Sequence, residues 1–161
     1  MHELKLPKMP NIIECFDISN LGPTNVCASM VQFRAGKPDK SNYRKFKIRT
    51  VAGQDDFASM REVIFRRYSK VEEFPDLVMV DGGLGQLNAA REVFDNLQIN
   101  IPLISIAKKE EKVYGIHLEN YGPIAINHKK ESLKLLQRIR DEAHRFVISY
   151  QKKLREKDMF D

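Results

Sequence analysis

Two aspartates lie in or directly after apolar segments that are typical of buried strands, where a carboxylate is unusual. Asp17 lies inside the apolar run of residues 11–19, and Asp81 comes directly after the four apolar residues 77–80. Because an ionised carboxylate among apolar side chains is costly unless it is paired or bound to a cation, both positions are candidates for chemistry. Acids at the ends of neighbouring strands share one cleft and repel each other, and a divalent cation relieves that repulsion. The structural alternatives are a turn in which Asp17 accepts backbone hydrogen bonds and an N-cap role for Asp81 at the next helix.

A histidine and a second pair of acids lie on predicted helices. His144 falls at the rim of the apolar stripe of the last helix, one turn after Arg140, from where a side chain can reach over the edge of a sheet. The structural alternative is a half-buried helix histidine. Asp55 and Asp56 open the first predicted helix. One of them can cap its free N–H groups, which leaves the other available for another purpose.

Positive charge is concentrated in two segments. The chain carries 27 Lys and Arg against 22 Asp and Glu, a net charge of +5. Residues 34–50 hold seven basic residues and one acid, residues 138–157 hold seven and three, and the remainder is net −5. The two basic segments flank the acidic positions, as a phosphate-binding rim would, although basic runs are also common on solvated faces. The candidate DNA contacts are Arg44, Lys45 and Lys47 in the first segment, and Arg138, Arg140 and Arg145 in the second.

Composition excludes several classes of protein. With 161 residues and 42% hydrophobic residues, the chain is predicted to form one domain over residues 1–161, with a core near 11–156 and no second domain. No apolar stretch approaches the roughly 20 residues of a membrane span, so no membrane partner is expected. Cys15 and Cys27 are too few for a disulfide framework, which favours a reducing, cytoplasmic location. The glycine-rich stretch 82–85 lacks the Gly-Lys-Ser/Thr ending of a phosphate loop and is a weak nucleotide motif; its glycines are interpreted as letting backbone and substrate approach Asp81 closely.

The order of predicted elements indicates an α/β fold. Residues 11–19, 26–33 and 42–50 form an antiparallel three-strand meander, and a helix starting at Asp55 and Asp56 presents Phe57, Met60, Val63, Ile64 and Tyr68 to the core. Strands at 77–80 and 103–107 enclose a helix that ends near Leu97. A small hairpin over 112–126 and a long helix over 131–157 complete the chain. Strand and helix alternate in the second half, which predicts parallel neighbours in a mixed sheet with helices on both faces.

Four segments in this order carry a resemblance to a known family. They are residues 14–19, 55–63, 75–90 and 135–146. Together they closely resemble the C-terminal endonuclease domain of UvrC, the incising subunit of bacterial-type nucleotide excision repair. The resemblance implies a ribonuclease-H-like fold and a DNA endonuclease that uses Mg²⁺ or Mn²⁺ to make the 5′ incision beside a lesion. It also implies damaged double-stranded DNA as partner, and a damage-verifying helicase subunit that binds through segments not expected in this chain.

The resemblance assigns roles to four residues. Asp17, Asp81 and His144 fall on the catalytic and metal-binding set of the family, and Asp56 falls on a further aspartate needed for incision. His144 could act as metal ligand, general base or orienting group. The sequence departs from the family pattern at residues 20–23 and 126–129, which puts loop contacts to DNA in doubt. Two other hypotheses are a ribonuclease-H-like DNA-binding module without nuclease activity of its own, and a nucleotide-binding α/β enzyme that uses residues 82–85.

Overall fold

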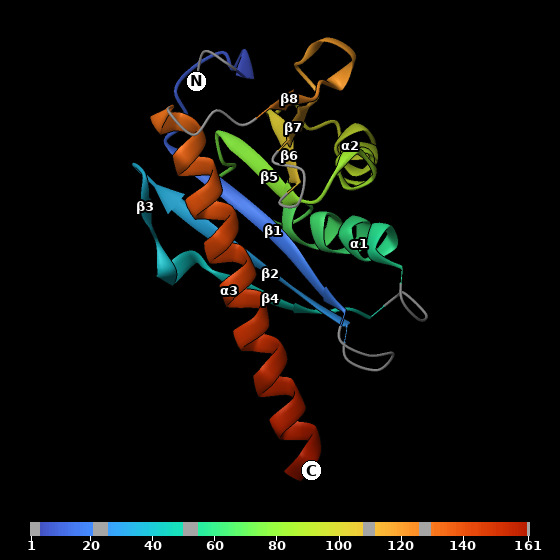
Figure 1. Cartoon of the computed structure of the whole chain (residues 1–161). Coiled ribbons are helices and arrows are strands. Elements are labelled where there is room, and N and C mark those ends of the chain that lie inside the picture. Colours follow the sequence, from blue (N-terminus) through green and yellow to red (C-terminus); the bar gives the residue numbers. More distant parts are fainter. Residues whose placement is uncertain (1–3, 21–25, 50–54, 108–111, 126–129, 161) are drawn as a thin grey trace.

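The computed structural model describes residues 4–20, 26–49, 55–107, 112–125 and 130–160, with side chains up to residue 157. Its described strands form one mixed eight-stranded sheet, in the order β3-β2-β1-β5-β6-β7-β8 with β4 also paired to β2 (Figure 1). The strands are β1 (Ile12–Asn20), β2 (Val26–Arg34), β3 (Lys37–Pro38), β4 (Arg44–Lys47), β5 (Leu77–Asp81), β6 (Leu103–Ala107), β7 (Lys112–Gly115) and β8 (Ile124–Ala125). The helices are α1 (Asp56–Tyr68), α2 (Leu84–Leu97) and α3 (Glu131–Phe160).

Strand β1 lies at the centre of the sheet and sets its mixed character. It pairs antiparallel with β2 along its whole length and parallel with β5, and β5 is parallel to β6. The predicted meander and the parallel strands are therefore confirmed. The third meander strand is shorter than predicted: β4 begins at Arg44, after a short 3₁₀ turn at Lys40–Asn42 that separates it from β3, and it ends at Lys47. Asp39 stabilises that turn by accepting hydrogen bonds from the side chains of Ser41 and Asn42.

The helices cover both faces of the sheet, as predicted (Figure 1). On one face α3 packs on β1 and β2, and its Leu136, Ile139 and Ala143 join a core that also includes residues of β5 and β6. On the other face α1 and α2 form the second half of the core, around Phe16 and Phe94. The mixed α/β sheet with helices on both faces agrees with the ribonuclease-H-like fold.

Smaller differences from the sequence expectations have local causes. Four of the five predicted core residues of α1 are buried, whereas Phe57, at the first turn, is 49% exposed. The hairpin strands β7 and β8 are short, because positive-φ residues at Asn120 and Tyr121 form the connection between them. The predicted turns at residues 21–25 and the segment 126–129 lie outside the described residues.

Both cysteines are free and buried, so they form no disulfide with each other. Among the described helices, none is long and apolar enough to cross a membrane. The single-domain boundaries and the cytoplasmic location stay predictions.

Candidate metal centre and nucleic-acid surface

The parallel register of β1 and β5 sets the two aspartates side by side. Cys15 pairs with Met79 and Phe16 with Val80, so the next pair along the strands is Asp17 and Asp81. Side chains alternate between the two faces of a sheet, and both aspartates therefore project to the α3 face with Cys15. Asp17 is 6% exposed and Asp81 lies at the C-terminal end of β5, which is where open sheets place their ligands.

His144 reaches the two carboxylates from α3. Its Nδ1 atom lies 3.1 Å from Oδ2 of Asp17, and half of its side chain is exposed. One ligand atom each from Asp17, Asp81 and His144 lie within 4.8 Å of one another. The structure thus brings together three residues that are far apart in the sequence, with two oxygen donors and one nitrogen donor.

The surroundings of Asp17 disfavour its ionised form. Burial, and next the nearby Asp81 carboxylate, raise the pKa of Asp17 from 3.8 to about 8. The more distant carboxylate of Asp56 contributes in the same direction. Two carboxylates this close cannot both ionise at low cost, and a divalent cation between them would favour the charged form of each.

The N-cap alternative for Asp81 is wrong. Gly83, not Asp81, is the N-cap of α2, and this N-cap makes no side-chain hydrogen bond. Gly82 has a φ of 140°, and a Cβ built there would lie 2.4 Å from Cγ of Gln86. Gly82 and Gly85 therefore make room for the side chains of Gln86 and Phe57, whereas a Cβ at Gly83 would meet nothing within 4 Å. The approach of substrate to Asp81 stays a prediction.

Asp55 and Asp56 divide their roles as the sequence suggested. Asp55 is the N-cap of α1, and its carboxylate accepts a hydrogen bond from the backbone N–H of Ala58. Asp56 accepts a hydrogen bond of 2.8 Å from the side-chain amide of Asn20, the last residue of β1. It is not a member of the cluster formed by Asp17, Asp81 and His144.

Comparison with known proteins identifies the family. The model of the UvrC RNase H endonuclease domain matches residues 1–148. The chain belongs to this family. UvrABC system protein C of Methanococcus maripaludis is 54% identical over 98% of this chain, and that of Methanosarcina barkeri is 52% identical over 98%. The same-named protein of Koribacter versatilis is 52% identical over 95%.

This UvrC-family chain spans under a third of the length of those relatives, covering 30%, 31% and 26% of them. Among solved structures, endonuclease V of Ciona intestinalis, in complex with an inosine-containing DNA, aligns with a TM-score of 0.36 at 16% identity. The alignment covers 63% of this chain and 50% of that one. A likeness this low carries no argument about function.

Three of the six candidate DNA contacts line one groove beside the metal centre. Arg44, Lys45 and Arg145 line a groove of about 430 Å³ between β4 and α3, together with Lys40 and two aromatic rings. The ammonium of Lys45 lies 5.7 Å and 5.5 Å from the ring centroids of Phe146 and Tyr150. Arg145 also lines a second groove along α3 that begins at His144. The basic segments are thus continuous with the acidic centre through Arg145.

The other three candidates differ in exposure. Arg138 and Lys47 are exposed, but neither lines these grooves. Arg140 is only 6% exposed, and its guanidinium pairs with Asp141 at 2.6 Å. Arg140 is buried because the face of α3 that it occupies packs on the sheet, and its role as a DNA contact stays a prediction.

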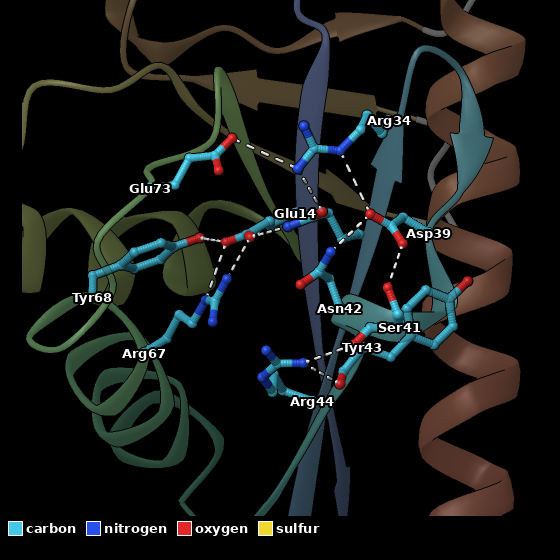
Figure 2. Close-up of polar contacts among 11 residues, drawn as sticks. Glu14, Arg34, Asp39, Ser41, Asn42, Tyr43, Arg44, Arg67, Tyr68 and Glu73 are labelled. Carbon is cyan, nitrogen blue, oxygen red and sulfur yellow. Dashed lines mark hydrogen bonds and ion pairs between the residues drawn. The ribbon is translucent and has the colours of Figure 1, made fainter.

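Sequence reasoning missed a buried polar cluster around Glu14, at the other end of β1 (Figure 2). Glu14 is fully buried and accepts hydrogen bonds from Gln32, Arg67 and Tyr68, with shortest distances of 2.7 Å to each. The signal was present in the sequence, because Glu14, like Asp17, is an acid inside an apolar strand. Another polar contact holds two residues of the groove between β4 and α3 in place. The hydroxyl of Tyr43 donates to the carboxylate of Glu142, which also pairs with Arg145.

Proposed function

We propose that this chain is a divalent-metal-dependent DNA endonuclease that makes the 5′ incision beside a lesion in nucleotide excision repair. The observation that carries this proposal is the convergence of Asp17, Asp81 and His144 at the carboxyl end of the central strands. Membership of the UvrC RNase H endonuclease domain family supports the nuclease role.

The residues of the cluster fit Mg²⁺ or Mn²⁺. Carboxylate oxygens suit either ion, and imidazole nitrogen is more typical of Mn²⁺ than of Mg²⁺. Burial, and next the Asp81 carboxylate, raise the pKa of Asp17, and a divalent cation at this position would favour its ionised form. When bound, such an ion supplies positive charge to the scissile phosphate and lowers the pKa of a bound water.

The chain's own side chains have distinct tasks in this proposal. Asp17 and Asp81 would hold the ion at the carboxyl ends of β1 and β5. His144, half exposed and 3.1 Å from Asp17, either completes the ligand set or accepts the proton of the attacking water. Asp56, hydrogen-bonded to Asn20 near the same end of β1, acts from outside the ligand set.

The basic grooves would hold the DNA backbone. Arg44, Lys45 and Arg145 are the proposed phosphate contacts nearest the centre, and Lys47 and Arg138 extend the positive surface. Damaged double-stranded DNA is the proposed partner. The helicase subunit that verifies damage would bind through other parts of the full-length relatives. Two free, buried thiols fit the proposed cytoplasmic location.

A nicking assay tests the proposal. The parent chain should nick supercoiled DNA in Mn²⁺ but not in EDTA, and it should cut an end-labelled lesion duplex on the 5′ side. Asp81→Asn should lower the rate about 1000-fold or more, because removal of one ligand leaves the ion loosely held. The matched control is Asp95→Asn, an exposed acid of α2 paired only with Arg91, which should keep the parent rate.

Nicking by Asp81→Asn at the parent rate, or nicking by the parent in EDTA, would show that the metal centre is wrongly assigned. Salt-dependent DNA binding by the parent, with no nicking in any metal, would instead favour the DNA-binding module.

A further inference from the structure

A second cavity lies at the carboxyl end of β1, on the face of the sheet opposite to His144. It has a volume of about 500 Å³ and is lined by Asn20, Asp55, Asp56, Phe57 and Gln86. Asn20 is three residues beyond Asp17 on β1, and Gln86 packs against Gly82, which follows Asp81. Two of the lining residues, Asn20 and Gln86, thus follow the proposed metal ligands within five residues, so the cavity and the metal centre share one end of the sheet.

An aromatic ring is held half exposed in this cavity. Phe57 is 49% exposed although it lies on the first turn of a helix whose other large apolar side chains of the same stripe are buried. Its ring rests on Gly85, where a Cβ would lie 2.5 Å from Cζ of Phe57. Leu84, beside that glycine, is 41% exposed. The absence of a side chain at Gly85 thus makes room for the tip of the ring, and about half of Phe57 stays exposed.

The charge of the cavity decides which part of DNA fits it. Asp55 and Asp56 line it, and none of its lining residues is a cation, so a phosphate would be repelled. The carboxylates can accept hydrogen bonds from the amino groups of bases, as acidic side chains do with cytosine N4. A flat, neutral group with N–H donors matches both the ring and the acids. A nucleobase has this chemistry, and every base has a face that stacks on an aromatic ring.

We propose that this cavity receives one unstacked nucleobase of the DNA strand being cut, with the base on Phe57 and its amino edge toward the carboxylates. The inference rests on the proposed nuclease function, since it places the base beside the scissile phosphate. It adds a contact that reads the strand through a base, where the basic grooves contact only the backbone. Bases that carry an amino group are then preferred over thymine at that position.

The test measures how Phe57 and one base depend on each other. Binding of the chain to a labelled duplex with a short unpaired region is measured in EDTA, so that neither cutting nor a cation held by the carboxylates contributes. Phe57→Ala should weaken binding about 10-fold, the size expected for loss of one base–aromatic stack. An abasic nucleotide is then placed at each position of the unpaired region in turn. The difference in binding between the parent and Phe57→Ala should disappear at one position only, where the base that stacks on Phe57 is missing. Phe57→Trp should bind as tightly as the parent.

Phe65→Ala is the matched control, because Phe65 is 52% exposed on the same helix but does not line this cavity. It should not change binding. Far-UV circular dichroism and Tm establish that each variant is folded. The proposal is overturned if Phe57→Ala binds like Phe65→Ala, or if its loss is the same at every abasic position. If the parent neither binds nor nicks DNA, the proposed function itself fails; if it nicks normally and only the Phe57 coupling is missing, the base pocket alone is wrong.

Discussion

Glu14 and Asp17 are two buried carboxylates three residues apart on the same strand, and their surroundings are opposite. Glu14 faces α1 and accepts hydrogen bonds from the amide of Gln32, the guanidinium of Arg67 and the hydroxyl of Tyr68. Asp17 faces α3, where it lies beside another carboxylate and an imidazole and accepts one hydrogen bond from the backbone N–H of Ile18. One acid is surrounded by donors within the protein, and the other is not.

The difference separates a structural acid from a functional one. A buried carboxylate whose acceptors are all used has nothing left to offer a ligand, and it ties β1 to α1. A buried carboxylate placed against a second acid is unfavourable by itself, and such sites are retained where a cation or substrate compensates them. Two tests of this contrast follow, in decreasing order of expected effect.

Removal of the charge of Glu14 should reduce stability more than removal of any surface charge. Glu14→Gln leaves the guanidinium of Arg67, whose side chain is 13% exposed, without its anion. Breaking a buried pair in this way costs about 3–5 kcal/mol in the free energy of unfolding. Urea denaturation measures it, with Glu131→Gln, an exposed acid of α3, as control. A loss below about 1 kcal/mol would mean that the cluster does not hold β1 to α1.

The charge of Glu14 stabilises the fold, whereas the charge of Asp17 should destabilise it in metal-free protein. Because its folded-state pKa is raised from 3.8 to about 8, folding takes up a proton between these values, and the free energy of unfolding falls as pH rises through that window. Relative to Asp17→Asn, which cannot titrate there, the parent should lose about 2.5 kcal/mol between pH 5 and pH 7. Denaturation in EDTA across this range measures the difference. Parallel curves for the two proteins would show that Asp17 is ionised without penalty.

The sequence predicted the parts of the molecule that depend on local pattern. Apolar runs located β1, β5 and β6, and the acids at Asp55 and Asp56 marked the start of α1. Asp17, Asp81 and His144 were also found, because two of them break apolar strand patterns and the resemblance supplied the third. Their approach to within 4.8 Å depends on the register of β1 with β5 and on the path of α3, which no local pattern encodes.

What the sequence did not predict depends on which way side chains face. Arg140 and Arg145 looked alike in one basic segment, yet one packs against the sheet and the other lines a groove. Phe57 continued the apolar spacing of α1 but lies beyond the end of the core, against Gly85. The partners of Glu14 come from β2 and α1. The sequence alone therefore did not show that the charge of Glu14 is paired with Arg67.

Mn²⁺ binding by the folded protein tests the central claim most directly, because it needs neither DNA nor turnover. Isothermal titration of the parent with MnCl₂ at pH 8, paired with Tm in the same buffer, should show saturable binding and a rise in Tm that follows occupancy. Asp17→Asn and Asp81→Asn should each weaken binding about 100-fold or more and remove the rise in Tm, while Asp95→Asn retains both. Equal Mn²⁺ affinity in the parent and in folded Asp17→Asn and Asp81→Asn would contradict the assignment of Asp17, Asp81 and His144 as the metal centre.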